Sequence, residues 1–414
     1  MNTKVIRENI DEAAALIAKG ALVAVPTETV YGLAGNGLDA EAVERIYEVK
    51  GRPEVKPLSL MVPGPEAFEK CCTCVPEAAR VLAKRFWPGP LTIVLPARQE
   101  IPKVVLAGGN TVGLRCPDHP LTLELLRKCG LPLAAPSANP SGAPSPKTAA
   151  EVLGYFEGKI EAVIDGGACG IGLESTIIDL THAPYRILRQ GALPEWDIAA
   201  ALAENMHIIG LTGGTGTGKT TALNVLSEMG ALCLDCDEVY HELTNTSAAL
   251  REAIERRFGS VYGADGRLDR KKLGQVVFSD PRALGELNLI THSFVEEEIK
   301  LRLRRHAMQG GTLAAIDAIA LLESGASKFC TETFGVIAPR ETREQRIMLR
   351  EGISREYARL RIDAQQPDEY YRERCTAILE NTGTKAEFAA KCRAAFTEVI
   401  ENGRKEGLPQ GTLL

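Results

Sequence analysis

A sequence typical of phosphate binding lies in the middle of the chain. Residues 213–220 read GGTGTGKT and fit the spacing G-x-x-x-x-G-K-[ST] without a mismatch. Glycines let the backbone turn tightly and point its N–H groups at a polyphosphate. Lys219 can place a positive charge beside the β- and γ-phosphates, and the Thr220 hydroxyl can bind Mg²⁺. The loop therefore predicts a site for a nucleoside triphosphate.

Carboxylates and arginines follow this loop in an order that suits phosphoryl transfer. Asp235 and Asp237 end one apolar stretch, and Asp317 ends a second, TLAAID. At the carboxyl ends of parallel strands, such carboxylates can meet an acceptor hydroxyl or Mg²⁺. The arginine-rich region 340–361 suits either a solvated helix face or a lid that clamps a phosphoryl group and excludes water. Because no guanine-specifying N-K-x-D occurs, a small-molecule kinase is favoured over a GTPase.

The first half has no such loop, but it carries polar residues around turns rich in glycine and proline. They are Lys50, Arg52 and Lys56 in KGRPEVK, Thr111 and Arg115 in TVGLR, the serines of APSANPSGAPSPKT, Ser175 in ESTIIDL, and Arg189 in ILRQGAL. Thr111 and Arg115, four residues apart, share one face of an expected strand. For each of these groups taken alone, a purely structural role is favoured over ligand binding. Together they predict a cavity that binds phosphate and carboxylate groups.

Two domains are expected to position these residues. The phosphate loop usually follows the first strand of a sheet, yet more than two hundred residues precede it here. We therefore expect a fusion of two enzymes joined near Asn205, with domains at 1–205 and 206–401 and a disordered tail at 402–414. The first twenty residues are expected to form an amphipathic acidic helix rather than a secretory signal.

Composition excludes several classes of protein. The 48 basic and 54 acidic residues give a net charge of −6, which argues against a basic nucleic-acid-binding domain. No apolar run approaches the roughly 20 residues that span a bilayer. The eleven cysteines are scattered and odd in number, which suits reduced thiols. We expect a cytoplasmic protein that does not bind membranes.

The second half, from His207 to about Ile400, resembles dephospho-CoA kinase. The resemblance rests on GLTGGTGTGKTT, LDCDEVYHEL, FGSVYGADGRLDRKKLGQVVF, ITHSFV, IDAIALLES, LREGISREYARLRIDAQ and ILENTGT, in the family's order. It implies transfer of a phosphoryl group from ATP to the 3′-hydroxyl of dephospho-CoA, on a parallel sheet with a helical lid. The chain departs from the family pattern at His241, Ile319 and Ser293.

The resemblance assigns roles to residues of this half. Asp237 is the expected general base, and Lys219 is the second catalytic residue. ATP is expected to contact Gly214, Thr215, Gly216, Thr217, Gly218, Lys219, Thr220, Thr221, Arg346 and Arg350, with Mg²⁺ on Thr220. Dephospho-CoA is expected to contact Asp237, His292 and Asp317.

Residues 8 to about 200 resemble the YrdC-like threonylcarbamoyl-AMP synthases. The matching stretches are PTETVYGL, KGRP with KPL, WPGPLT, TVGLR, PDHP, APSANPSG, GLEST and LRQGAL. Such enzymes take L-threonine, bicarbonate and ATP and release pyrophosphate and threonylcarbamoyl-AMP. A downstream tRNA threonylcarbamoyl transferase complex then modifies adenosine 37 of tRNA. The resemblance also implies a twisted mixed sheet with an open cleft, and it leaves room for a weak contact with tRNA.

The second resemblance divides the polar residues of the first half between two ligands. ATP is expected to contact Lys50, Arg52, Lys56, Thr111, Ser137, Ser145 and Arg189. Threonine is expected to contact Thr29, Met61, Arg115, Ala135 and Ser175. Arg115 is suited to pair with the threonine carboxylate. Met61 stands where many relatives carry His.

Two alternatives from other functional classes stay open at this point. The first half could be an RNA-binding module without catalysis, which salt-sensitive RNA retention without ATP turnover would favour. The second half could phosphorylate another small acceptor, such as a nucleoside monophosphate. Phosphorylation of AMP or CMP, with none of dephospho-CoA, would favour that alternative.

Overall fold

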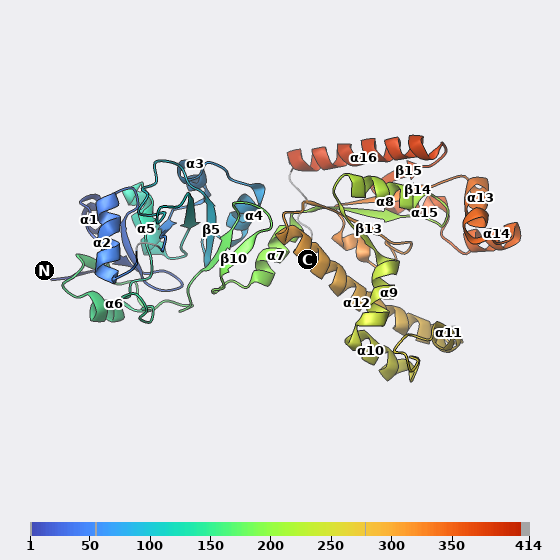
Figure 1. Cartoon of the computed structure of the whole chain (residues 1–414), viewed down its shortest axis with the longest axis horizontal. Coiled ribbons are helices and arrows are strands. Elements are labelled where there is room, and N and C mark those ends of the chain that lie inside the picture. Colours follow the sequence, from blue (N-terminus) through green and yellow to red (C-terminus); the bar gives the residue numbers. More distant parts are fainter. Residues whose placement is uncertain (1, 54–55, 278, 407–414) are drawn as a thin grey trace. The chain divides into compact units, whose positions relative to one another are not determined.

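The computed structural model describes residues 2–53, 56–277 and 279–406. The chain divides into two compact units, Met1–Leu202 and Ala203–Leu414, and the division falls inside helix α7 (Glu195–Glu204) (Figure 1). Within the described residues, no helix is both long and apolar enough to cross a membrane.

Unit 1 is built on a mixed sheet of ten strands, in the order β1-β8-β2-β3-β7-β4-β6-β5-β9-β10. The strands are β1 (Lys4–Ile6), β2 (Val23–Val25), β3 (Gly32–Asn36), β4 (Ser59–Met61), β5 (Leu91–Pro96), β6 (Thr111–Arg115), β7 (Leu133–Ala134), β8 (Ala162–Ile164), β9 (Thr176–Asp179) and β10 (Arg186–Arg189). The sheet contains parallel pairs, such as β4 with β6, and antiparallel pairs, such as β5 with β6. The expected mixed sheet is confirmed.

Short helices cover the sheet of unit 1. They are α1 (Ile10–Ala18), α2 (Ala40–Lys50), α3 (Phe68–Cys71), α4 (Glu77–Phe86), α5 (Pro120–Cys129) and α6 (Ala149–Phe156), with the 3₁₀ turn η1 (Pro65–Ala67). Ile10, Ile17 and Leu125 of α1 and α5 pack with strand residues in one apolar core. The expectation of one helix over the first twenty residues is wrong in part. Lys4–Ile6 forms a strand instead, because it pairs in parallel with β8.

Unit 2 is built on an all-parallel sheet of five strands, in the order β12-β13-β11-β14-β15. The strands are β11 (His207–Thr212), β12 (Leu232–Asp235), β13 (Leu313–Asp317), β14 (Glu332–Ile337) and β15 (Ala377–Glu380). The expected parallel sheet is confirmed. Because β11 lies between β13 and β14, the phosphate loop that follows it opens near the middle of the sheet edge.

Helices cover this sheet and extend beyond it. They are α8 (Lys219–Glu228), α9 (Cys236–Thr246), α10 (Ala248–Phe258), α11 (Arg270–Val277), α12 (Pro281–Met308), α13 (Arg340–Glu351), α14 (Arg355–Asp363), α15 (Asp368–Arg374) and α16 (Lys385–Glu406), with the 3₁₀ turn η2 (Ala326–Phe329). Side chains of α8 and α16 pack together on the sheet in one core, and Figure 1 shows these two helices side by side. Helices α10, α11 and α12 share a smaller core.

The chain after residue 401 differs from the expected disordered tail over its described part. Residues 402–406 continue α16. A helix that is already packed gains a backbone hydrogen bond with each added residue, which favours continuation. The remainder of the tail, 407–414, lies outside the described residues.

Candidate functional sites

The phosphate loop of unit 2 connects β11 to α8 and depends on its glycines. Gly213, Gly216 and Gly218 have φ angles of +135°, +82° and +110°, a region that side chains disfavour. A Cβ atom at Gly213 would lie 2.2 Å from the carbonyl oxygen of Val336. Only glycine fits there, so the loop conformation that exposes N–H groups follows from the sequence.

The loop lines a cavity of about 420 Å³ with most of the residues expected to bind ATP. The lining includes Gly214, Thr215, Gly216, Gly218, Lys219, Thr220, Asp235, Asp237, Asp317, Arg346, Arg350 and Arg361. Thr217 and Thr221, which were also expected to contact ATP, are not among the lining residues. The Thr217 hydroxyl donates a hydrogen bond to Gly214 O (2.8 Å), so this side chain shapes the loop.

Asp317 at the end of β13 is the buried carboxylate of this cavity. Burial raises its pKa to about 6, the Lys219 ammonium lowers it, and the charges of Asp235 and Asp237 raise it. Its Oδ1 atom lies 3.9 Å from Lys219 Nζ and has no hydrogen-bond partner among the described residues. An orphaned carboxylate oxygen in a cavity that Thr220 also lines fits Mg²⁺, which takes one or two protein oxygens plus phosphates and waters. Such a site needs no cluster of protein ligands around the ion. The described part of the chain contains no group of three or more His, Cys, Asp or Glu side chains that could hold a metal ion.

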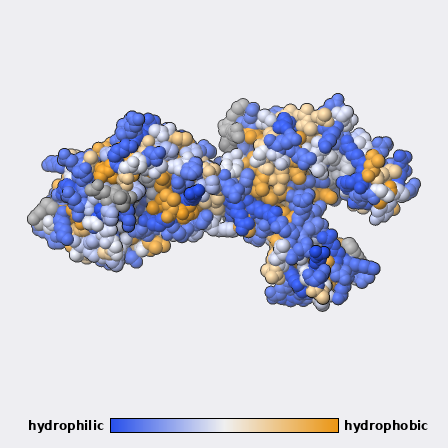
Figure 2. Space-filling model, in the orientation of Figure 1, coloured by the Kyte–Doolittle hydropathy of each residue, from blue (hydrophilic) through white to orange (hydrophobic). Residues whose placement is uncertain are grey.

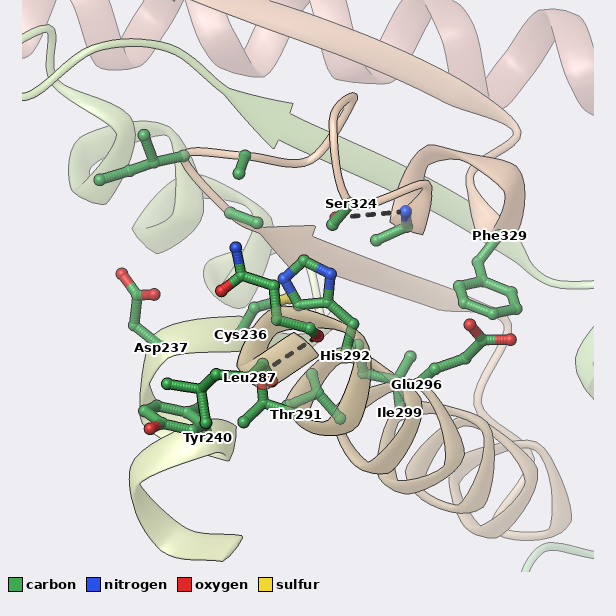
Figure 3. Close-up of a pocket in the computed structure, with 16 residues that line it drawn as sticks. Cys236, Asp237, Tyr240, Leu287, Thr291, His292, Glu296, Ile299, Ser324 and Phe329 are labelled. Atoms are coloured by element: carbon green, nitrogen blue, oxygen red, sulfur yellow. Dashed lines mark hydrogen bonds between the residues drawn. The ribbon is translucent and has the colours of Figure 1, made fainter. Parts of the chain in front are cut away.

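A second cavity of about 270 Å³ adjoins the first, and Asp237 lines both. Figure 3 shows Asp237 and Tyr240 of α9 at one end of this second cavity and Phe329 at the other. His292 of α12 points into it, as expected for an acceptor-binding residue. Asp317 does not line it, so the structure groups Asp317 with the phosphate loop rather than with the acceptor cavity.

The arginine-rich region forms two helices, α13 and α14, and its arginines divide into groups. Arg346, Arg350 and Arg361 line the phosphate cavity. Arg340, Arg355 and Arg359 instead form ion pairs with Glu344, which is only 3% exposed. Arg355 and Arg359 of α14 thus reach α13, and Arg340 of α13 also pairs with Asp363 of α14 (2.8 Å), so these three arginines hold the two helices together.

Two further residues of the lid, neither of which was assigned to a site from the sequence, hold the phosphate loop. Arg343 donates to Thr215 O (3.0 Å) and to Gln365 Oε1 (2.8 Å). Gln365 accepts from Thr215 N (2.9 Å) and donates to Thr215 Oγ1 (2.8 Å). On the other side of the loop, Asn381 donates to Thr217 O (2.7 Å). No pattern in the sequence distinguishes Gln365 from a helix-surface glutamine.

In unit 1, the structure brings together four of the five residues expected to bind threonine, Thr29, Met61, Arg115 and Ala135. Arg115 donates to Thr29 Oγ1 (2.7 Å), and its partner across the β4–β6 ladder is Met61. A Cβ at Gly32 would lie 3.2 Å from Met61 Cε and 3.7 Å from Ala135 Cβ, so these residues adjoin one another. Ser175, the residue before β9, shares a hydrogen bond with Thr92 of β5 (2.9 Å).

The residues expected to bind ATP in unit 1 form two connected groups. Ser145 donates to Glu174 (3.0 Å), and Glu174 also pairs with Arg189, which donates to Ser175 O (2.9 Å). Lys50 donates to the carbonyls of Ser137 and Asn139 and so holds the serine-rich loop. Burial lowers the Lys50 pKa to about 8, with a further contribution from the Arg52 charge, while Glu174 raises it.

The other expected ATP residues are less closely joined. Arg52 donates to the carbonyls of Lys56 (3.3 Å) and Pro57 (3.1 Å), so Lys56 takes part through its backbone. Thr111 begins β6, and its side chain makes no hydrogen bond to the rest of the group within the described residues.

Two glutamates that sequence reasoning missed are paired with the expected binding arginines. Glu28 Oε1 accepts from Arg115 (2.8 Å), and its Oε2 accepts from Asp118 N (2.9 Å). Glu174 occupies the corresponding place beside Arg189. Both glutamates stand inside the motifs PTETVYGL and GLEST, next to residues that were singled out, and that proximity was the available signal.

Comparisons with known proteins assign both halves. Residues 15–191 match the Sua5, YciO and YrdC family model, described as telomere recombination, and residues 207–387 match that of dephospho-CoA kinase. A threonylcarbamoyl-AMP synthase of Pyrococcus abyssi is 50% identical over 204 residues, which cover 48% of this chain and 60% of the relative. A second protein carrying that synthase name, of Mycobacterium tuberculosis, is 36% identical over 193 residues, 47% of this chain and 88% of its own length. A dephospho-CoA kinase of Geobacter sulfurreducens is 36% identical over 183 residues, 44% of this chain and 93% of the relative.

The chain thus spans only 60% of the length of its Pyrococcus abyssi relative, while it spans nearly all of the kinase relative. Each match stays within one unit of the structure. The chain belongs to the Sua5, YciO and YrdC family through residues 15–191 and to the dephospho-CoA kinase family through residues 207–387.

Proposed function

We propose that unit 2 transfers the γ-phosphoryl group of ATP to the 3′-hydroxyl of dephospho-CoA. The observation that carries this proposal is the position of Asp237, which lines both the phosphate cavity and the adjoining acceptor cavity. A hydroxyl bound in the second cavity would meet both this carboxylate and the phosphate held in the first. Asp237 would then accept the hydroxyl proton as the γ-phosphorus is attacked.

The remaining residues of the phosphate cavity supply charge. Lys219, Arg346 and Arg350 would neutralise the phosphate oxygens as negative charge moves toward the leaving ADP. Mg²⁺, held by Thr220, Asp317 and the phosphates, would supply further positive charge. His292 would position the acceptor.

We propose that unit 1 condenses L-threonine, bicarbonate and ATP to threonylcarbamoyl-AMP, with release of pyrophosphate and water. Arg115 and Ser175 are 6% and 3% exposed and Thr29 is fully buried, so a threonine held there would be shielded from water. That matters because the carbamate of threonine is unstable and must be held against the α-phosphate. Arg52, Lys56, Ser137, Ser145, Thr111 and Arg189 would hold ATP, with Lys50 beneath the serine loop.

Partners and location follow from these two reactions. Threonylcarbamoyl-AMP would pass to a tRNA threonylcarbamoyl transferase complex, with at most a weak contact between this chain and tRNA. The eleven cysteines are all free thiols, which supports a reducing compartment such as the cytoplasm. The two alternatives, an RNA-binding module and a nucleoside monophosphate kinase, are not favoured. The relatives of the first half are named threonylcarbamoyl-AMP synthase, and those of the second half are named dephospho-CoA kinase.

Chromatography of the nucleotide products of the purified full chain tests both reactions. ATP with L-threonine and bicarbonate should give pyrophosphate and threonylcarbamoyl-AMP. ATP with dephospho-CoA should give ADP and CoA. Lys219→Ala should abolish only the second reaction, and Arg115→Ala only the first. Phosphorylation of AMP or CMP without any of dephospho-CoA, or RNA binding without pyrophosphate release, would contradict the respective proposal.

A further inference from the structure

The acceptor cavity has an apolar end and a polar end. Ile299 and Phe329 lie far from Asp237, whereas Tyr240 lies beside it on α9. An acceptor that is a nucleoside carrying a 5′-diphosphate has a flat base, a ribose and two phosphate charges. With its 3′-hydroxyl at Asp237, the base suits the apolar end. The diphosphate, attached to the same ribose, must then leave the cavity near Asp237 and Tyr240.

The cations at the apolar end of the cavity are already neutralised. Lys300 and Lys328 both form salt bridges with Glu296, at 3.3 Å and 2.8 Å, and Glu296 itself lines the cavity. Both ammonium groups also lie near the Phe329 ring. A diphosphate placed there would face a carboxylate and would have to displace two ion pairs, which is unfavourable.

The polar end offers a cation without a carboxylate partner. Arg270, the first residue of α11, donates from Nη2 to Nδ1 of His241 (3.0 Å). Since a guanidinium can only donate, the ring proton of His241 lies on Nε2 and can be donated to an anion. Among the described residues, Arg270 forms no salt bridge with a carboxylate, and the side chains of Arg270 and His241 are both exposed.

Arg270 and His241 are also close to the reacting group. His241 follows Asp237 by four residues on α9, so it lies about 6 Å further along the same helix face. The Tyr240 and His241 rings are 5.6 Å apart, and the Arg270 charge lowers the Tyr240 pKa against the raising effect of burial. Arg270 also lines a cavity of about 600 Å³, together with Thr244, Asn245, Asp265 and Arg267, which gives room for the rest of the acceptor. In Figure 2, the lobe of α10 and α11 presents mainly hydrophilic residues.

We propose that Arg270, together with His241, binds the diphosphate of the acceptor and so selects dephospho-CoA over acceptors that lack a diphosphate. The inference rests on the proposed kinase activity and names the subsite that distinguishes its substrate. Arg270 and His241 are binding residues and touch no atom that reacts.

Steady-state kinetics of the full chain at saturating MgATP test this subsite. Arg270→Ala should raise the KM for dephospho-CoA roughly 10-fold or more, with kcat and the KM for ATP within two-fold of the parent. Adenosine lacks the diphosphate, so its inhibition constant against dephospho-CoA should not change. Arg270→Lys, which keeps the charge but loses the forked geometry, should restore part of the affinity. Lys271→Ala removes an equal charge from the next residue and should leave all constants unchanged.

Three results would overturn the subsite. An unchanged KM for dephospho-CoA in Arg270→Ala would show that the diphosphate binds elsewhere. A structural role would be shown if kcat fell while the KM for ATP and the inhibition constant of adenosine both rose by a similar factor. An equal effect of Lys271→Ala would show a general field of positive charge. Failure of the parent protein to phosphorylate dephospho-CoA would instead contradict the proposed kinase activity, and the two failures are therefore distinguishable.

Discussion

A single buried carboxylate sets the pH dependence expected of the kinase site. Because burial raises the Asp317 pKa to about 6, the ligand-free protein holds this group protonated below that pH. A protonated carboxyl cannot bind Mg²⁺, so kcat/KM for MgATP should fall with decreasing pH below about 6. Asp317→Asn should lower kcat/KM roughly 100-fold at pH 8 and remove this inflection. An inflection that survives in Asp317→Asn would assign it to another group.

The same carboxylate should cost the protein stability at neutral pH when nucleotide and Mg²⁺ are absent. Its folded-state pKa lies above the unfolded value, so its contribution to stability is fully present below about pH 4 and is lost as the pH rises through 6. A shift of this size corresponds to about 3 kcal/mol. Asp317→Asn should therefore unfold at higher denaturant than the parent at pH 8, and the gap should close toward pH 4.

Glu174 places a negative charge among the cations expected to bind ATP in unit 1. It pairs with Arg189 and accepts from Ser145, and its side chain is 34% exposed. ATP phosphates must compete with this carboxylate, so Glu174→Gln should lower the KM for ATP two- to five-fold in pyrophosphate release. The effect should shrink with added salt. Glu44→Gln, on the exposed face of α2, is the matched control. A raised KM would show instead that Glu174 orients Arg189 for binding.

At the scale of elements, the lid and the phosphate loop are joined by Gln365. The Gln365 amide oxygen accepts from Thr215 N, and its amide nitrogen donates to Thr215 Oγ1. Arg343 donates to the same amide oxygen, Gln365 Oε1. Gln365→Ala removes one partner of the buried Arg343 and both hydrogen bonds of Gln365 to Thr215, which loosens this end of the loop. We expect the KM for ATP to rise roughly 10-fold, with the KM for dephospho-CoA nearly unchanged. Equal changes in both constants would contradict a role confined to the loop.

Elements with a strict local requirement could be predicted from the sequence, and those that depend on distant pairing could not. The loop Gly213–Thr220 follows from glycine geometry, and the structure has it between strand β11 and helix α8. Lys4–Ile6 reads as helix by composition but pairs with β8, more than 150 residues away. Gln365 and Glu28 were missed for the same reason, since their partners Thr215 and Arg115 are distant in sequence.

At the scale of the whole molecule, each unit has its own apolar core. Residues of β2, α1 and α5 form one cluster in unit 1, and residues of β11, α8 and α16 form another in unit 2. The two clusters have no residue in common, and each unit is within the size range of domains that fold alone. Damage to one core should therefore reduce one activity only.

Phe396 and Phe156 allow a reciprocal test of this independence. Phe396 is fully buried in α16 and packs edge-to-face on Phe334 at 5.1 Å, and Phe156 is fully buried in α6. Replacing either by alanine removes a large buried ring and leaves a cavity, at a cost of about 3–5 kcal/mol. After stepwise heating of the full chain, Phe396→Ala should lose CoA formation several degrees earlier while pyrophosphate release survives as in the parent. Phe156→Ala should show the opposite pattern. If either variant lost both activities at one temperature, the units would unfold together, and the fusion would be a cooperative assembly rather than two enzymes on one chain.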